Sequence, residues 1–386
     1  MKHILFVSHD ASRTGAPVLL LHFLKWFKKN TTYPFVVLLR QDGVLREEFE
    51  KLAPVMVYQP RLKFKATFFN KFKSRFFTGN EKKDPVRHFL SQYDIGLIFS
   101  NTLTNGKVLQ DIEYLQVPVI SYIHELKYTL SVEYAGPYLD YSVKKTDFFL
   151  AGSKAVQNNL INSYQISSEK TKVIYSFLPP DFFTKSSPDF NKDAFKKSLG
   201  LDSDTLVVGG IGAGAWRKGI DLFILLAKVL LTNYPTTKYH FIWIGVGAQP
   251  NEQQMLAYDI EKAGLVNHIQ LLPSTPEYSK YLQVFDVFVL SSREDPYPLV
   301  VLEAALLEKA IICFEGAGGT PEFVKEDAGI QVPYLDITGM ATAIHKLQQN
   351  TEFRVQLGRV AKDRVSQMHD VEVAAPDVVS VIKNFL

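Results

Sequence analysis

Short apolar runs recur along the whole chain, and stretches with helical spacing separate them. The runs are continuous rather than alternating, which is typical of strands buried on both faces of a parallel sheet. We expect two series of strands, at 4–7, 35–39, 95–99, 117–123, 148–150 and 173–175, and at 206–211, 240–244, 269–272, 287–290 and 310–314. Helical patterns such as 18–28 and 221–231 lie between them. The pattern predicts an α/β fold with two Rossmann-like domains and parallel sheets.

The two series are separated at a pair of prolines, Pro179 and Pro180, which a polar stretch follows. We therefore expect an N-terminal domain over 1–178 and a C-terminal domain over 179–365. A helical segment over 366–386 is expected to cross back to the N-terminal domain. The length of 386 residues exceeds what one hydrophobic core usually holds, which agrees with two domains.

The composition is that of a globular protein, with 46% hydrophobic residues and a mean hydropathy of −0.02. The single cysteine, Cys313, lies in an apolar run, so no intrachain disulfide can form and a reducing compartment is favoured. The first apolar run is too short for a signal peptide, and no run approaches the length of a membrane span. We expect a cytoplasmic protein.

The segment 61–83 differs from the rest of the chain because it is strongly basic. It carries eight Lys or Arg residues and one acid, and five phenylalanines recur at helical spacing (Phe64, Phe68, Phe69, Phe72 and Phe76). Two interpretations stay open: an amphipathic helix on an anionic membrane surface, or a helix that packs its phenylalanines on its own domain. Nucleic acid is not expected as a partner, because the remaining chain is acidic and has no nucleic-acid motif.

The most informative stretch runs from Ser292 to Glu303, after the expected strand 287–290. Its acidic and proline-rich start cannot continue a strand, and an apolar helix is expected from Leu299. Asp295 therefore lies in a loop and Glu303 in a helix, both at the carboxyl edge of a parallel sheet. An ionised glutamate can accept two hydrogen bonds from a ribose diol, and Asp295 suits the hydroxyls of a sugar; Glu294 competes with Asp295 for that role.

Three glycine-containing turns are candidates for contacts with phosphates or other anions. The first, 212–219, follows the strand 206–211 and carries Arg217 and Lys218, which can neutralise a diphosphate. The second surrounds Gly15 after the first strand, although the G-x-G-x-x-G dinucleotide pattern is absent there. A third turn, 316–322, follows the strand 310–314, and its backbone amides can form an anion nest.

Polar residues also follow two strands of the first series. His124 and Glu125 come directly after 117–123, and His124 could hydrogen-bond a sugar; Asn101, Thr102 and Asn105 follow 95–99 as acceptor-side candidates. A histidine satisfied within the core is the alternative for His124. Asp202 and Asp204 spell an aspartate pair used by metal-dependent enzymes, but they precede a strand at the wrong edge of the sheet. The histidines show no ligand spacing, so no metal site is expected.

Together these segments resemble a GT-B-fold retaining glycosyltransferase of family 4. The matching segments are 41–49, 100–106, 123–125, 217–219, 292–303 and 317–322. The resemblance implies that Glu303 binds the ribose, that Lys218 contacts the diphosphate, and that His124 approaches the C6 hydroxyl of the sugar. The predicted catalytic residues are His124, Asp295, Lys218 and Arg217. The predicted donor-binding residues are Gly15, Gly214, Arg217, Lys218, Glu294, Asp295, Tyr297, Leu299, Val300, Glu303, Gly318 and Gly319.

The sequence departs from the family pattern in two places. Asp295 replaces the first glutamate of the E-x7-E motif, and Pro-Tyr-Pro stands where Gly-Phe-Gly is commoner. The family's arginine before the lysine is missing, and Arg217 is a candidate substitute. Both changes concern the sugar and the phosphates rather than the ribose.

The resemblance implies a metal-independent transfer, without any cofactor, from a nucleoside-diphosphate sugar to a cell-surface glycan or its lipid-linked precursor. Alternatives are a nucleotide-sugar epimerase or sugar-phosphate synthase of the same fold, and a nucleotide-sugar-binding subunit without turnover. The base, the sugar, the acceptor and the oligomeric state do not follow from the sequence.

Overall fold

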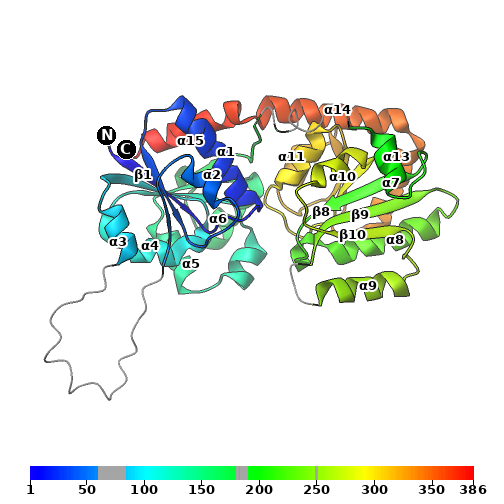
Figure 1. Cartoon of the computed structure of the whole chain (residues 1–386), viewed down its shortest axis with the longest axis horizontal. Helices are drawn as coiled ribbons and strands as arrows, with labels where there is room; N and C mark the ends of the chain where they lie inside the picture. The colour runs from blue at the N-terminus through cyan, green and yellow to red at the C-terminus, as the bar shows by residue number, and fades with distance from the viewer. Residues whose placement is uncertain (60–83, 180–181, 183–189, 248–250) are drawn as a thin grey trace, which may run out of the picture.

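The computed structural model describes residues 1–59, 84–179, 182, 190–247 and 251–386 (Figure 1). Two parallel sheets form its centre, one of seven strands and one of six. The expected basic helix at 61–83 and Pro180 lie outside the described residues. Among the described residues, no helix has the length and apolar content to cross a bilayer.

The N-terminal sheet has the strand order β3-β2-β1-β4-β5-β6-β7. Its strands are β1 (His3–Ser8), β2 (Phe35–Leu39), β3 (Val55–Val57), β4 (Ile95–Ser100), β5 (Val119–Ile123), β6 (Phe148–Ala151) and β7 (Thr171–Val173). The helices around it are α1 (Gly15–Asn30), α2 (Arg46–Glu50), α3 (Pro85–Leu90), α4 (Gly106–Asp111), α5 (Pro137–Lys145) and α6 (Lys154–Tyr164). Short 3-10 turns at Leu103–Asn105, Glu113–Leu115 and Ser168–Lys170 and a π-helical turn at Thr129–Glu133 complete the domain.

The C-terminal sheet has the order β10-β9-β8-β11-β12-β13. Its strands are β8 (Leu206–Ile211), β9 (Tyr239–Val246), β10 (Ile269–Pro273), β11 (Val287–Leu290), β12 (Ala310–Phe314) and β13 (Gly329–Val332). Its helices are α7 (Lys192–Ser198), α8 (Ile220–Asn233), α9 (Glu252–Lys262), α10 (Tyr278–Val284), α11 (Leu299–Leu306), α12 (Thr320–Val324), α13 (Ile337–Gln349) and α14 (Thr351–Met368). A 3-10 turn, Trp216–Lys218, follows β8.

The predicted α/β class and the two parallel sheets are confirmed. Strands such as β2, β8, β11 and β12 are buried at almost every position, which explains their continuous apolar sequences. Two edge strands, β3 and β13, were not expected, because they are short and only partly buried. The last strand of the first series is displaced from the expected 173–175 to β7, since its polar residues Thr171 and Lys172 hide it from a search for apolar runs.

The last helix, α15 (Val371–Lys383), lies on the N-terminal domain beside α1 (Figure 1). Trp26 of α1 donates a hydrogen bond from Nε1 to Glu372 Oε2 at 2.6 Å. The chain therefore passes between the domains twice. The two passages pair with each other, because Leu178 N donates to His369 O at 2.8 Å and Val371 N donates to Leu178 O at 2.9 Å.

Candidate functional site

An ion pair lies where the loops after β8 and β11 meet. Lys218 Nζ is 2.5 Å from Asp295 Oδ2, and the Asp295 residue is only 4% exposed. Ser292 Oγ donates to the same carboxylate oxygen at 3.4 Å. Burial lowers the pKa of Lys218, and the charge of Arg217 adds to this effect, whereas Asp295 opposes it. The two residues were predicted separately; the structure brings them together as a buried pair.

The turn after β12 fixes the backbone of Asp295. Asp295 N donates to Ala317 O at 2.7 Å, and Gly319 N donates to Asp295 O at 3.1 Å. Gly318 has a φ of +127°, and a Cβ atom there would lie 1.9 Å from Asp295 O. Glycine is therefore required at this position both by the backbone conformation and by the close approach of the two loops. The predicted anion nest and the carboxylate loop form one unit.

Glu303 lies on α11, whose residues are mostly apolar and buried. The residue is 5% exposed, and its Oε2 atom has no hydrogen-bond partner among the residues that the structure describes. Burial raises the pKa of Glu303 to about 7, and the nearby hydroxyl of Tyr278 lowers it by a smaller amount. A buried carboxylate oxygen without a partner is costly. Such an atom is available to a ligand that donates hydrogen bonds.

Predicted acceptor-side residues meet at the carboxyl edge of the N-terminal sheet. His124 Nε2 lies 3.2 Å from Asn101 Oδ1, and Asn101 Nδ2 donates to Ala16 O at 2.8 Å. Thr102 donates its hydroxyl proton to the Glu125 carboxyl group, which also accepts from His124 N at 3.1 Å. Burial lowers the pKa of His124 to about 3 and raises that of Glu125 to about 7. His124 is therefore neutral at physiological pH and can accept or donate one hydrogen bond.

Two further residues of this edge were missed by the sequence analysis. Arg40 follows β2 and donates from Nη1 to Thr104 O at 2.6 Å, while His9 follows β1. Burial lowers the pKa of His9, with a smaller contribution from the charge of Arg40, and His9 adds to the effect of burial on His124. The signal that could have found them is a polar residue directly after a buried strand.

Other predicted donor-binding residues have buried or closely packed surroundings. The Tyr297 side chain is 7% exposed, and its hydroxyl lies 3.1 Å from His369 Nε2, so it belongs to the passage between the domains. Leu299 is buried in the core around α11, where Val300 also packs. Gly214 lies against Glu252 of α9, where a Cβ atom would overlap the carboxyl group. The structure does not bring the Tyr297 side chain to Lys218, Asp295 and Glu303.

Glu294 and Glu322 both contact the opposite domain. The Glu294 carboxylate accepts from Tyr128 N at 2.9 Å and from Thr129 N at 3.4 Å. The Glu322 carboxylate accepts from Lys154 N at 2.9 Å and from Ala155 N at 2.7 Å. The Glu294 side chain is thus used by backbone amides rather than placed beside Asp295.

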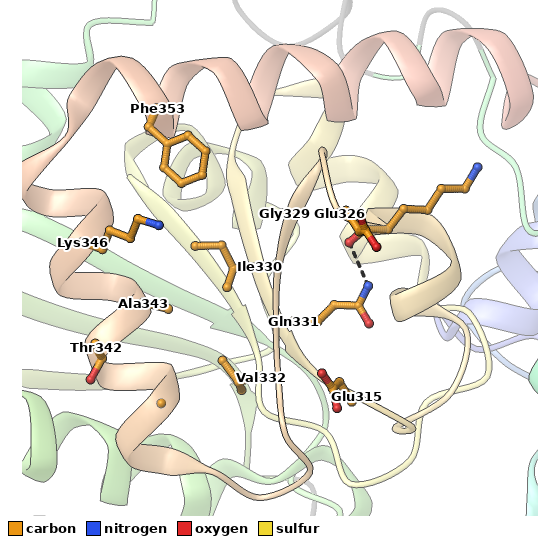
Figure 2. A pocket seen from close by; sticks show the side chains of 12 residues that line it. Glu315, Glu326, Gly329, Ile330, Gln331, Val332, Thr342, Ala343, Lys346 and Phe353 are labelled. Atoms are coloured by element: carbon orange, nitrogen blue, oxygen red, sulfur yellow. Dashed lines mark hydrogen bonds between the residues drawn. The ribbon is translucent and has the colours of Figure 1, made fainter.

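A pocket of about 590 Å³ lies along the outer edge of β13 (Figure 2). Ile330 and Val332 of β13 and Lys346 and Phe353 from α13 and α14 line it. None of its lining residues is a predicted catalytic or binding residue.

Asp202 and Asp204 are exposed and both pair with Lys238. Over the described part of the chain, no group of three His, Cys, Asp or Glu side chains is placed to hold a metal ion.

The comparison with protein families identifies the C-terminal domain. Residues 191–364 match the family described as glycosyl transferases group 1. The match covers a little under half of the chain. It includes Lys218, Asp295 and Glu303, so the site described above lies in the part of the chain that is similar to this family.

The curated proteins that the chain resembles are distant relatives. It is 24% identical over 234 residues to the D-inositol 3-phosphate glycosyltransferase of Corynebacterium kroppenstedtii, covering 58% of this chain and 51% of the relative. It is 22% identical over 232 residues to an uncharacterized glycosyltransferase of Methanocaldococcus jannaschii, covering 60% and 58%. The chain thus aligns with a little over half the length of these relatives.

Solved structures share the whole fold. Anabaena HepE in complex with UDP is 22% identical, with a TM-score of 0.80 and complete coverage of both chains. Sucrose-phosphate synthase of Thermosynechococcus elongatus is 16% identical, with a TM-score of 0.77 and coverage of 100% and 98%. The predicted GT-B architecture is therefore confirmed.

Proposed function

We propose that the protein is a retaining glycosyltransferase of the family 4 type. It transfers a sugar from a nucleoside-diphosphate sugar to a hydroxyl of a cell-surface glycan or of a lipid-linked glycan precursor. The observation that carries the proposal is the Glu303 carboxyl group, which is buried and has one oxygen atom without a partner among the described residues. It lies eight residues after Asp295, on the helix that follows the lysine–aspartate pair.

Glu303 binds the ribose of the nucleotide. An ionised carboxylate accepts hydrogen bonds from the two ribose hydroxyls, and such charge-assisted bonds contribute about 1.5–3 kcal/mol each. Binding of the hydroxyls stabilises the ionised form, which burial alone disfavours. The nucleotide therefore supplies the hydrogen-bond donors that the folded chain does not.

Lys218, with Arg217 beside it, stabilises the diphosphate as negative charge develops on the leaving group. The backbone amides of residues 316–318 add hydrogen-bond donors to the same region. Asp295 holds Lys218 in place through the 2.5 Å contact and orients the sugar with its second oxygen. This neutralisation by protein groups needs no metal ion.

In the transfer step, the acceptor oxygen approaches the anomeric carbon from the face that the diphosphate leaves. The bond between the anomeric carbon and the phosphate oxygen breaks, the new glycosidic bond forms, and the acceptor proton moves to the departing phosphate. His124 is neutral and contacts a sugar hydroxyl, while Asn101, Thr102 and Glu125 form the acceptor side. The protein thus contributes positioning and charge stabilisation rather than a nucleophile.

UDP-containing donors are the first choice for a test, because the HepE structures of similar fold contain UDP and UDP-glucose. We expect UDP to raise the melting temperature of the wild-type protein, and Glu303→Ala to abolish this shift. Glu308→Ala is the matched control, since Glu308 is exposed and pairs with Lys362 near the same helix. A panel of other nucleoside diphosphates covers a different base. If none of them binds the wild-type protein, the proposal is wrong.

Turnover is tested separately from binding. Release of nucleoside diphosphate from a bound donor, with or without an acceptor glycan, is the expected result. Binding without any release across a broad acceptor panel would instead identify a nucleotide-sugar-binding subunit.

A further inference from the structure

Two carboxylates of the C-terminal domain accept hydrogen bonds from backbone amides of the N-terminal domain. They are the side chains of Glu294, in the loop after β11, and Glu322, in the helix α12. Neither side chain contacts Lys218 or Glu303 through a hydrogen bond among the described residues. Both are close in sequence to the candidate site, however, and both join it to the opposite domain.

Glu322 completes the N-terminus of helix α6. The first two amides of that helix, Lys154 N and Ala155 N, donate to the two Glu322 oxygens at 2.9 and 2.7 Å. The third amide, Val156 N, donates to Ser153 Oγ at 3.1 Å within the N-terminal domain. The positive end of the helix dipole and the two amide donors favour a negative charge at this position. The helix is thus capped partly by its own domain and partly by the other one.

Glu294 links the lysine loop to the segment that follows His124 and Glu125. Its carboxylate accepts from Tyr128 N and Thr129 N, and its own backbone amide donates to Arg217 O at 3.3 Å. The rings of Tyr128 and Trp216 lie 4.9 Å apart beside this contact. Any change in the position of Glu294 would therefore be transmitted to Arg217 and its neighbour Lys218.

We propose that Glu294 and Glu322 are positioning residues for glycosyl transfer. They hold the two domains in the closed arrangement in which the His124 edge faces the Lys218–Asp295 pair. The expected effect on kcat rests on the proposed function, whereas the role of the two glutamates in holding the domains together does not. The contacts are ion–amide bonds that water can replace when the domains separate, so closure is reversible and a product can leave.

The neutral substitutions Glu294→Gln and Glu322→Gln keep the side-chain shape and remove the charge. We expect UDP to bind the double variant E294Q/E322Q with unchanged affinity, because Glu303 and Lys218 are intact. The kcat should fall about tenfold or more, since the closed state is populated less. A fall in UDP affinity equal to the fall in kcat would overturn the assignment of these residues as positioning groups.

Domain closure is measured directly with spin labels on α5 and α9, at Lys144→Cys and Glu261→Cys, which are exposed positions in different domains. Cys313 is buried, so it does not compete for the label. We expect E294Q/E322Q to lengthen or broaden the label distance in pulsed electron resonance, with and without UDP. Glu308→Gln, a neutralised glutamate with a partner in its own domain, should leave the distance unchanged.

An unchanged distance in E294Q/E322Q would overturn the inference. The single variants guard against unfolding: a variant whose circular dichroism matches the wild type but whose distance shifts supports it. If no nucleoside diphosphate of the panel binds the wild-type protein, the proposed function is refuted but this inference is not, because the distance comparison without nucleotide still decides whether the two glutamates hold the domains together.

Discussion

At the scale of single residues, the pair Lys218 and Asp295 defines the chemistry of the site. Both side chains are removed from water, so each charge depends on the other for compensation. From the sequence, Asp295 is predicted to bind the sugar and Lys218 the diphosphate, as separate tasks. Their contact implies that a change in Asp295 alters both tasks.

Replacement of Asp295 by asparagine should therefore cost stability as well as activity. The uncompensated Lys218 is expected to lower the free energy of unfolding by about 3 kcal/mol. Turnover should be lost, whereas UDP should still bind through the unchanged Glu303, with an affinity lowered by the altered position of Lys218. Thermal unfolding, calorimetric UDP titration and donor hydrolysis measure the three effects. Asp204→Asn is the matched control, since Asp204 pairs with Lys238 on the surface; similar destabilisation by both changes would contradict the prediction.

Glu303 gives a pH-dependent prediction. Its pKa is raised from 4.5 to about 7 by burial, so its protonation stabilises the folded state. This contribution is complete below about pH 4.5 and is lost as the pH rises through 7, with a total on the order of 3 kcal/mol. Glu303→Gln should therefore be more stable than the wild type at pH 8, and the difference should vanish near pH 5. Melting curves across this range test it, and a difference independent of pH would refute it.

At the scale of elements, the turn between β12 and α12 brings the two domains close together. A Cβ atom on Gly319 would lie 2.2 Å from Pro296 O and 2.9 Å from Ser153 Cβ of the other domain. The turn leaves no room for a side chain on either side. Gly319 is therefore required by these two close approaches rather than by flexibility.

Gly319→Ala should consequently lower stability by about 1–3 kcal/mol, because the loops and the domain contact must shift. Unfolding by urea measures the loss. Gly15→Ala is the control for stability, since a Cβ atom at Gly15 would meet no atom within 4 Å. Equal stability of G319A and G15A would contradict the prediction.

The sequence was sufficient to predict the main strands and the buried position of Glu303 in a helix, because continuous apolar runs and a carboxylate within an apolar helix are local signals. Strand β3 is apolar but only three residues long, and β13 contains Gly329 and Gln331, so neither gives a continuous apolar run of ordinary strand length. The contact between Lys218 and Asp295 joins residues far apart in sequence, and its geometry depends on the folded loops. The amide contacts of Glu294 and Glu322 depend on the arrangement of two domains, which no local pattern encodes.

At the scale of the whole molecule, we expect the two domains to move relative to each other by bending at the two paired passages around Leu178 and His369. His369 is 1% exposed there. Its Nδ1 atom lies 3.0 Å from Ser176 O, and its Nε2 atom lies 3.1 Å from the Tyr297 hydroxyl oxygen. Burial lowers its pKa to about 4, so it is neutral at physiological pH. Because the two passages are hydrogen-bonded to each other, they are expected to bend together.

Helix α15 should stabilise the N-terminal domain, on which it packs, rather than the C-terminal domain, which precedes it in the chain. Val378 is fully buried against the N-terminal core, so Val378→Ala should lower stability by about 2 kcal/mol. Faster amide hydrogen exchange is expected in α1 and not in α8. The control Val373→Ala changes a residue of the same helix that is 51% exposed. Faster exchange in α8 instead would contradict this placement.

The position of α15 also has a consequence for synthesis of the chain. A ribosome releases the strands of the N-terminal sheet first, but the helix that covers α1 emerges only after every strand of the second sheet. Until then the apolar residues of α1 that α15 covers stay exposed to solvent or to chaperones. The C-terminal domain can finish folding before α15 packs on the N-terminal domain. The N-terminal domain is therefore synthesised first but completed last.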